Sequence, residues 1–457
     1  MKAVAFNGLT RRRQLAAMVA GSGAVLAACV PGADSGAGGQ RGPLSGDMEF
    51  WFHWAANTAG YYEAMQRSAA WFRAENPGVQ LTANQVTGSA QQEKLTILAA
   101  SGSRPPDVMT TSSVTVGLAA AKLLRPIDDL LRTSKIKRSQ FLDSAWDGSA
   151  WRGQTYGVLT VAFELPFCLA WNKTLFTQRG LDPEKPPRTN LDLFELGAKI
   201  TQPDKQDGLA LLGFHPLYGS GSNWSTWLMR HGIPAKEVWD PKTPEKVRIN
   251  QPAIEQIFTD NLNYLKRLDL GRIDVWRKAW PGDNGFANSA NAMMIRGSPY
   301  PGLLSAANPA LLPYIGYGWI PTQKSERVQG FNPWNLTIPA GAKRADLAMT
   351  FIEFWTTFRV QDMMRELTGS FGAIKEYIDK ADLRQQPPGV STIFGMLKQV
   401  ERLEPNGVVM PLTVPFGTAM TAAWDSVVAS KATPRQALEE TQKNVQGQLD
   451  EVIQKGR

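Results

Sequence analysis

Residues 48–54, Met-Glu-Phe-Trp-Phe-His-Trp, open the stretch that decides the fold. This aromatic-rich run predicts a buried β-strand. From Tyr61 to Glu75 apolar residues recur at helical spacing, and Asn76-Pro77-Gly78 ends the predicted helix. A strand followed so closely by a helix is the first half of a βαβ unit.

The same alternation continues downstream. Residues 79–86 alternate as a second strand, 91–100 read as a helix, and 107–110 read as a short third strand. Strands that alternate with helices predict a parallel α/β sheet. Ligands of such sheets bind beyond the carboxyl ends of the strands, so the loops at 54–57 and 111–113 are candidate binding segments.

Composition and charge exclude several classes of protein. The chain has 457 residues, 43% hydrophobic and 20% charged, which allows two or three soluble domains. No apolar run reaches the roughly 20 residues of a membrane span. The net charge is +8, but half of this excess lies in residues 1–28, and no basic block follows. We therefore expect no nucleic-acid partner.

The metal-binding residue types are few and scattered. The three histidines, His53, His215 and His231, show no zinc-site spacing, and we predict neither a metal nor a cofactor. Of the two cysteines, Cys168 has apolar neighbours and reads as a buried hydrophobe. Catalytic motifs such as GxSxG, the P-loop and HExxH are absent, so no catalytic residues are assigned. The sequence thus predicts a binding protein rather than an enzyme.

The N-terminal 28 residues have the layout of a secretory signal peptide: a basic start, an apolar stretch from Leu15, and small residues before Cys29. The sequence LAAC at 26–29 resembles a bacterial lipobox, which predicts that Cys29 is lipidated. Arg11-Arg12 resembles a twin-arginine signal, and a merely basic segment using the general export route is the alternative. Residues 29–46 are rich in Gly, Ala, Ser and Pro and are expected to form a flexible tether.

Seven segments in the body of the chain carry a family resemblance. In chain order they are FRAENPGV at 72–79, QEKL to PDV at 92–108, LRPIDDL at 124–130, GQTYGV at 153–158, WNKTLF to PRT at 171–189, AMMIRG at 292–297, and IPAGAK with the helix to Trp355 at 338–355. In this order they resemble the sugar-type family of bacterial extracellular solute-binding proteins, the maltose- and glycerol-phosphate-binding group. The chain departs from the family at Leu159, where proline is usual, and at Pro299-Tyr300, where tryptophan is common. Residues 376–457 match poorly.

The resemblance implies an α/β, two-lobe periplasmic-binding-protein fold with discontinuous lobes and a ligand cleft between them. Residues 47–160 and 329–375 would form the first lobe, and 161–328 and 376–457 the second. Closure would be a hinge motion. The implied partners are a small solute, the ABC permease subunits and their ATPase. The protein would be a monomer, exported and held on the outer face of the cell membrane by its lipid.

Aromatic rings and short polar groups are the chemistry that a sugar requires, because its rings expose C–H patches between hydroxyls. Aromatic residues in loops are therefore the first candidates for ligand contact: Trp54, Trp224, Tyr300 and Trp334. The polar candidates are Asn57, Glu93, Thr111, Ser112, Glu164 and Ser298. For each aromatic residue, ordinary core packing is the alternative, and for Glu93 it is favourable charge at a helix start. Trp71, Trp171 and Trp355 lie inside predicted elements and are expected in the core.

The solute and the use of the protein stay open. We expect an uncharged mono- or oligosaccharide first and a glycerol-phosphate-like compound second, since a phosphate would need converging donors that do not cluster here. A lipoprotein that uses the same body for sensing or adhesion is a further alternative.

Overall fold

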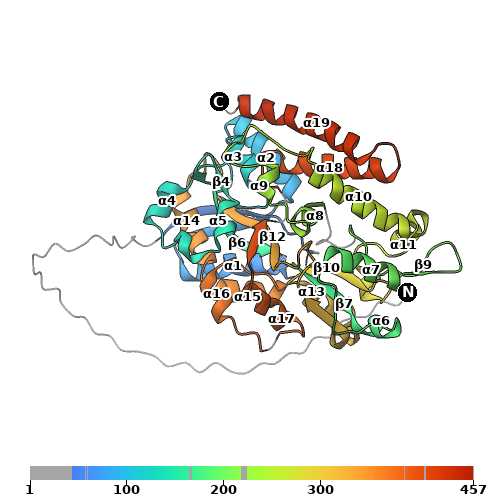
Figure 1. The fold of residues 1–457 in the computed structure, drawn as a ribbon. Helices are drawn as coiled ribbons and strands as arrows, with labels where there is room; N and C mark the ends of the chain where they lie inside the picture. Colours follow the sequence, from blue (N-terminus) through green and yellow to red (C-terminus); the bar gives the residue numbers. More distant parts are fainter. Residues whose placement is uncertain are drawn as a thin grey trace, which may run out of the picture. The chain divides into compact units, whose positions relative to one another are not determined.

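The computed structural model describes residues 44–56, 58, 60–163, 167–217, 224–384, 386–405 and 408–455. The elements predicted between residues 48 and 110 are present in the predicted order: β1 (Gly46–Phe52), α1 (Tyr61–Glu75), β2 (Val79–Gln85), α2 (Gly88–Ser101) and β3 (Val108–Thr111). Figure 1 shows them in blue and cyan. The predicted signal peptide, Cys29 and most of the predicted tether lie outside the described residues.

The folded body begins slightly earlier than predicted. Gly46 is already paired with Val79 in β1, and Leu44 packs against the core, so the last residues of the predicted 29–46 tether belong to the fold. Gly46 N also donates a hydrogen bond to Gly78 O at 2.9 Å. This pairing, which composition could not reveal, extends the first strand toward the N-terminus.

The first sheet has six strands among the described residues. Its order is β13 (Arg402–Pro405), β12 (Val328–Thr337), β3, β1 and β2, and β6 (Gly157–Phe163) also pairs with β12. Strand β1 runs parallel to β2 and β3, as predicted, whereas β12 runs antiparallel to β3 and β6. The carboxyl ends of β1 and β3 therefore meet at one edge of the sheet.

Helices cover both faces of this sheet. Successive side chains of β1 point to opposite faces, so each face has its own packing partners. Phe50 faces α14 (Ala345–Trp355), where its ring lies 5.0 Å from that of Phe351. Trp51 faces the other way and packs with Leu95 of α2. The larger side, which we call the first core, also holds α1, α15 (Phe358–Thr368) and residues such as Val161 and Leu336.

The second sheet has three antiparallel strands in the order β10 (Met293–Gly297), β7 (Phe167–Asn172) and β11 (Ile315–Gly318). Strand β7 is buried along its whole length. Around it lies a second core, built on α7 (Asn190–Ile200), α8 (Trp224–Arg230), α10 (Pro252–Arg267), α18 (Thr413–Val428) and α19 (Pro434–Lys455). Each sheet thus has a hydrophobic core of its own.

Short elements complete the chain. The helices are α3 (Thr115–Ala120), α4 (Asp128–Thr133), α5 (Asp143–Asp147), α6 (Lys173–Gln178), α9 (Ala235–Val238), α11 (Leu270–Ala279), α12 (Asn284–Ala287), α13 (Tyr300–Ala307), α16 (Lys375–Lys380) and α17 (Val390–Leu397), with 3-10 turns η1 (Arg138–Gln140) and η2 (Pro309–Tyr314). The short strands are β4 (Ala150–Trp151), β5 (Gln154–Thr155), β8 (Gln202–Pro203) and β9 (Leu209–Leu211). No helix of the described residues combines the length and apolar character that a membrane span needs.

The β6–β7 connection and strand β12 each pass from one core to the other. Val161 at the end of β6 lies in the first core, and Phe167 at the start of β7 lies in the second. Within β12, Val328 lies in the second core and Phe331 in the first. Gly330 sits between them, where an added Cβ would lie 2.9 Å from the Phe167 ring, so only glycine allows this approach.

The segment after residue 375 divides its buried side chains between the two cores. Tyr377 and Phe394 pack in the first core, where both rings contact Phe371, whereas Ile393 and Met396 of α17 belong to the second core. From Val408 onward the buried side chains belong to the second core.

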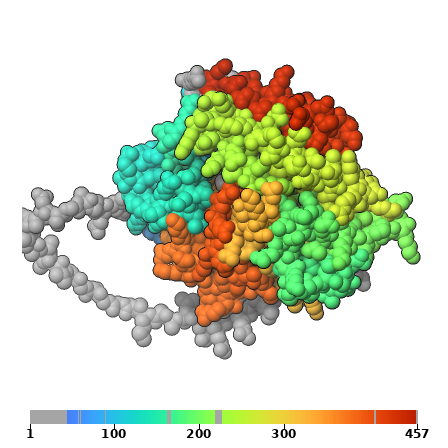
Figure 2. All heavy atoms as spheres, viewed as in Figure 1, coloured from blue at the N-terminus to red at the C-terminus, as the bar shows by residue number. Residues whose placement is uncertain are grey.

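The C-terminal helices α18 and α19, drawn in red in Figures 1 and 2, form a hairpin that packs against α10. Trp424 of α18 packs edge-on against Trp227 at 4.7 Å. In α19 the amide of Gln442 accepts a hydrogen bond from Ile249 N and donates one to Val247 O. The hairpin is therefore an integral part of the second half of the molecule.

Candidate functional site

The site is built where three strands of the first sheet expose side chains. His53 and Trp54 follow the end of β1, and Ser112 follows the end of β3. Trp334 comes from β12, where the pairing with β6 shifts register between Trp334 and Asn335. A β-bulge of this kind bends the strand and re-aims a side chain.

Three aromatic rings cluster at this edge. The ring centroids of His53 and Trp334 are 4.6 Å apart, and those of Trp54 and Trp334 are 4.5 Å apart. Trp54 also stacks on Tyr61 of α1 at 5.1 Å with an interplanar angle of 16°. Only 5% of Trp54 is exposed, whereas Trp334 is half-buried. Trp54 therefore supports the other two rings from within the first core.

A cavity of about 790 Å³ opens beside these rings. Its lining residues are His53, Gly88, Gln91, Gln92, Glu93, Thr96, Ile97, Ser112, Val114, Trp334 and Val414. Val414 belongs to α18, so the C-terminal hairpin of the second half contributes one wall. The cavity lies within the size range of small-molecule sites.

Two polar atoms at this cavity are buried and have no hydrogen-bond partner among the described residues, namely His53 Nδ1 and Gln91 Nε2. Buried polar groups normally find a partner, because leaving one unpaired costs about 1–3 kcal/mol. Burial also lowers the pKa of His53, which favours the neutral imidazole at neutral pH. Both atoms are shielded from solvent in this structure, and both residues line the cavity.

Glu93 is the only carboxylate of this lining and lies exposed near the start of α2. No lysine or arginine belongs to the lining. The undescribed internal residues 57, 59, 164–166, 218–223, 385 and 406–407 contain none either, and Glu164 is their one charged residue. The described lining therefore carries one negatively charged side chain and no positively charged one.

Thr111 lies beneath the cavity wall rather than in it. It is buried, and its hydroxyl lies 2.7 Å from that of Thr115. The Thr115 hydroxyl donates to Ser112 O at 2.7 Å and accepts from Asn335 Nδ2 at 3.0 Å. This chain of hydrogen bonds ties the β3 end to β12 and so positions Ser112 relative to Trp334.

The predicted residues Ser298 and Tyr300 lie elsewhere. Both are buried, and neither lines this cavity. The guanidinium of Arg296 lies 5.2 Å from the centre of the Tyr300 ring, and Arg296 is paired with Asp283 at 2.7 Å. A Cβ at Gly369 would lie 2.8 Å from Pro299 Cα, so this segment packs against the end of α15.

Of the ten predicted contact residues, the structure brings Glu93, Ser112 and Trp334 to the cavity, with Trp54 behind them. Asn57, Glu164 and the side chain of Trp224 lie outside the described residues. Among the expected core tryptophans, Trp171 and Trp355 are buried, and Trp71 is half-buried under the guanidinium of Arg359.

Sequence reasoning missed His53, Gln91 and Val414. His53 stands directly before Trp54 at the end of a predicted strand, and that position was a usable signal. Gln91 opens the helix predicted for 91–100, two residues before Glu93. Val414 lies in the part of the chain that matched the family poorly, and no local feature distinguishes it. Among the described residues no group of His, Cys, Asp and Glu could hold a metal ion.

Comparison with known proteins matches residues 55–362 to the family model of bacterial extracellular solute-binding proteins. Among curated proteins, the sn-glycerol-3-phosphate-binding periplasmic protein UgpB of Escherichia coli K12 is 28% identical over 169 residues, which span 36% of this chain and 36% of that protein. The matched stretch therefore covers little more than a third of that relative.

Solved structures match nearly the whole folded body. The sugar-binding protein MalE of Xanthomonas citri is 17% identical with a TM-score of 0.70, covering 89% of this chain and 98% of that one. CpMnBP1 with mannotriose bound is 23% identical with a TM-score of 0.68, covering 87% and 99%. The GacH receptor of Streptomyces glaucescens, solved with acarbose, is 20% identical with a TM-score of 0.67, covering 89% and 99%. These likenesses confirm the predicted two-lobe α/β fold.

Proposed function

The chain belongs to the bacterial extracellular solute-binding protein family, and we propose that it captures a carbohydrate for uptake by an ABC importer. Solute binding itself catalyses no reaction, so we assign no catalytic residue. The permease subunits and their ATPase are the expected protein partners, and the binding protein acts as a monomer.

One observation carries this proposal: an aromatic pair, His53 and Trp334, adjoins unpaired hydrogen-bonding atoms in one cavity. A sugar ring needs both, since its C–H faces pack on aromatic rings and its hydroxyls need polar partners. Sugar-binding proteins are also among the structures of the same fold. The cavity chemistry and the comparisons therefore point to the same class of solute.

Within the cavity we assign ring packing to Trp334 and His53, and hydrogen bonding to Gln91, Glu93 and Ser112. Trp54 and Thr111 then act as supports. Asn57, Glu164, Trp224, Ser298 and Tyr300 stay as proposed contacts for a closed, ligand-bound state. In that state the two proposed lobes, residues 47–160 with 329–375 and residues 161–328 with 376–457, would meet around the solute.

A glycerol-phosphate-like solute is the second candidate, favoured by the likeness to UgpB. The absence of lysine and arginine from the lining argues against it. A thermal-shift panel separates the two, since a ligand at 100 times its Kd adds about 2.7 kcal/mol of stability. Neutral mono- and oligosaccharides should raise the melting temperature, and sn-glycerol 3-phosphate should not. A shift with glycerol phosphate alone would contradict the carbohydrate proposal.

Export and anchoring complete the proposal. We propose that residues 1–28 are removed and that Cys29 becomes the lipidated N-terminus, which holds the protein on the outer face of the cell membrane. Mass spectrometry of the membrane fraction should find an acylated Cys29 peptide. In the Cys29→Ala variant the protein should leave the membrane fraction. Recovery of an unmodified Met1, or of a membrane-bound variant, would contradict the anchor.

A further inference from the structure

Helix α2 (Gly88–Ser101) forms one wall of the candidate cavity. Six of the eleven lining residues belong to this helix: Gly88, Gln91, Gln92, Glu93, Thr96 and Ile97. A separate cavity of about 380 Å³ adjoins the C-terminal half of α2, where its lining includes Leu95, Leu98 and Ala99. Open space therefore lies beside α2 along most of its length.

Few side chains attach α2 to the rest of the protein. Among its described side chains only Gln91 and Leu95 are buried. In α1, a helix of nearly the same length, six side chains are buried. Leu95 packs in a small cluster with Trp51, Val86 and Met109, which is separate from the first and second cores. We call these four residues the α2 cluster. One leucine is thus the main apolar anchor of the helix.

Polar contacts add little to this attachment. The described side chains of α2 form no hydrogen bond or ion pair with another helix or strand. Thr96 and Ser101 donate to carbonyl groups of α2 itself. The ammonium group of Lys94 lies 5.8 Å from the centroid of the Trp51 ring, which is an exposed and weak contact. An element held by so few contacts opens locally at low free energy.

The N-terminal end of α2 lies against His53. A Cβ at Gly88 would lie 2.9 Å from His53 Nδ1, so glycine permits this approach. His53 Nδ1 and Gln91 Nε2 are shielded from solvent and lack a hydrogen-bond partner among the described residues. Shielding a polar atom without a partner is unfavourable. A movement of α2 that admits water or a solute hydroxyl to these two atoms removes that cost.

The ends of α2 are also loosely held. Thr87, the residue before the helix, makes no side-chain capping hydrogen bond. At the other end Gly102 adopts a φ of 66°, and an added Cβ there would meet no atom within 4 Å. Neither end is therefore fixed by packing against a neighbouring element.

We propose that α2 is a movable wall of the cavity: it swings off the α2 cluster as a unit, exposes His53 and Gln91 to the solute, and is held in place once the solute is bound. Other lining residues, such as Trp334 and Ser112, belong to the strands and strand ends of the first sheet. A solute that contacts them and α2 together stabilises the closed position of the helix. This rests on the proposed carbohydrate function and adds a local closure to the hinge motion expected between the lobes.

Two neighbouring residues of β3 provide a matched pair for the test. Met109 and Val108 are both fully buried, but Met109 packs in the α2 cluster and Val108 in the first core. Met109→Cys and Val108→Cys are made in the full-length chain carrying Cys29→Ala, and the labelling rate of each introduced thiol is measured with a soluble thiol reagent. Cys168, buried in β7, reports opening of the second core in both proteins.

The thiol introduced by Met109→Cys should react at least about a hundredfold faster than that introduced by Val108→Cys, because lifting a weakly packed helix costs less free energy than opening a core. A saccharide that raises the melting temperature is then added. At about 100 times its Kd it should slow the Met109→Cys reaction by up to about a hundredfold, since binding to the closed position lowers the open population by the factor 1 + [L]/Kd.

Hydrogen exchange of the unaltered chain provides a second measurement without any substitution. Amides of residues 88–101 should exchange at least about tenfold faster than those of 61–75, and the same saccharide should slow them. This comparison stays decisive even if Met109→Cys itself loosens the α2 cluster.

The possible results separate this inference from the proposed function. Equal labelling of the two introduced thiols, with equal exchange of the two helices, overturns it and leaves carbohydrate binding intact. Fast labelling and exchange that do not respond to a bound saccharide overturn it as well, because α2 then moves independently of the solute. If no saccharide binds, the proposed function fails and the coupling of α2 to a carbohydrate fails with it.

Discussion

The imidazole of His53 and the indole of Trp334 lie with ring centroids 4.6 Å apart and an interplanar angle of 35°. One ring follows a strand near the start of the folded chain, and the other sits on a strand almost 300 residues later. They meet because β12 pairs with β3, which itself pairs with β1, and because β12 bulges at Trp334. The sheet topology therefore creates the aromatic surface of the cavity.

Replacing Trp334 with alanine should remove ring packing without unfolding the protein. The ring is half-buried and lines the cavity, so the solute loses a large contact area and affinity should drop tens- to hundreds-fold. Trp54→Ala should behave differently, because a buried tryptophan replaced with alanine costs about 3–5 kcal/mol of folding free energy. Calorimetric affinity and melting temperature, measured on the same samples, distinguish the two variants.

Trp71 of α1 provides a control. Its ring packs under the guanidinium of Arg359 from α15, and it does not line the cavity. Trp71→Ala should leave affinity unchanged. Should Trp334→Ala bind the solute as tightly as the unaltered chain, the aromatic role assigned to it is wrong.

The sequence predicted the first five elements closely because their signals are local. Helix α1 spans the predicted residues, since its apolar spacing and the Asn76-Pro77-Gly78 stop both lie within the segment itself. The rule that ligands bind beyond strand ends also led to Ser112, which lines the cavity. These inferences need only neighbouring residues.

What the sequence could not predict depends on contacts between distant segments. Trp54 was expected to contact the solute. It is buried because its ring stacks on Tyr61 of α1 and packs against Trp334 of β12. The role of Val414 depends on where α18 is held, which is set by Trp424 against Trp227. Neither contact can be predicted from the spacing or composition of the neighbouring residues.

Glu93→Gln should weaken binding of a neutral sugar about ten- to hundredfold, because a hydrogen bond to a charged group is worth about 1.5–3 kcal/mol. Its side chain is exposed, so the melting temperature without ligand should stay unchanged. Glu63→Gln, on an exposed turn of α1, is the matched control and should bind normally. Equal affinity of Glu93→Gln and the unaltered chain would remove Glu93 from the site.

His215 should make stability fall in acid. Burial, and secondarily the charge of Arg277, lower the pKa of His215 to about 3, and its Nδ1 accepts a hydrogen bond from Leu217 N at 3.0 Å. Between pH 6.5 and about 3 the unfolded chain binds a proton that the folded chain does not. This contribution to stability is therefore complete above pH 6.5 and declines as pH falls, by up to about 1.4 kcal/mol per pH unit.

Urea unfolding at pH 7 and pH 4.5 measures this effect. The drop in unfolding free energy between the two pH values should be smaller in His215→Gln than in the unaltered chain. His231, whose pKa burial lowers to about 4, contributes with the same sign and remains in the variant. An identical drop in both proteins would show that His215 does not set the acid sensitivity.

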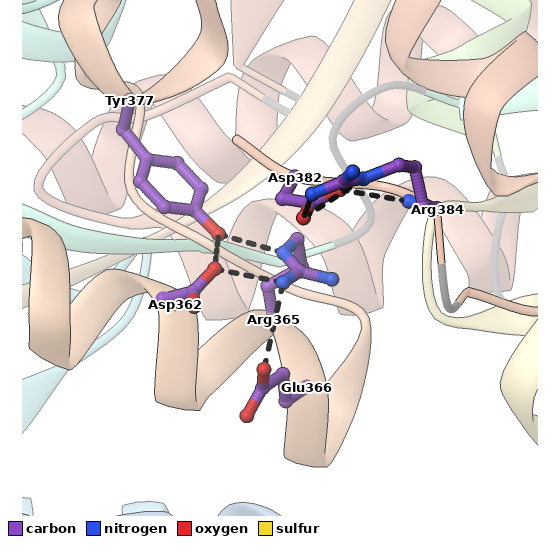
Figure 3. A network of polar contacts seen from close by, with 6 residues as sticks. All are labelled: Asp362, Arg365, Glu366, Tyr377, Asp382 and Arg384. Carbon is purple, nitrogen blue, oxygen red and sulfur yellow. Dashed lines mark hydrogen bonds and ion pairs between the residues drawn. The ribbon is translucent and has the colours of Figure 1, made fainter. Parts of the chain in front are cut away.

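A buried polar network joins α15 to α16 (Figure 3). Arg365 is only 2% exposed, and its Nε donates to the Tyr377 hydroxyl at 2.8 Å while its Nη2 donates to Asp362 Oδ1 at 2.7 Å. The Tyr377 hydroxyl in turn donates to the same carboxylate oxygen at 3.1 Å. Burial is the main cause that raises the pKa of Tyr377, so the phenol keeps its proton for this bond. Arg365 Nη2 also lies 3.8 Å from Glu366 Oε1, so two carboxylates and one phenol surround the guanidinium.

Tyr377→Phe should cost about 1–3 kcal/mol of folding free energy, because it leaves Arg365 Nε buried without an acceptor while the ring still fills its place. The pair Asp382–Arg384, drawn beside the network in Figure 3, provides the contrast: its side chains are exposed although their atoms are only 2.6 Å apart. Arg384→Ala should leave stability essentially unchanged, since an exposed ion pair gains little over its hydration. Chemical denaturation of both variants measures the difference. If Tyr377→Phe proves as stable as Arg384→Ala, the buried network does not hold α15 and α16 together, and their attachment depends on apolar packing such as Phe371 against Tyr377.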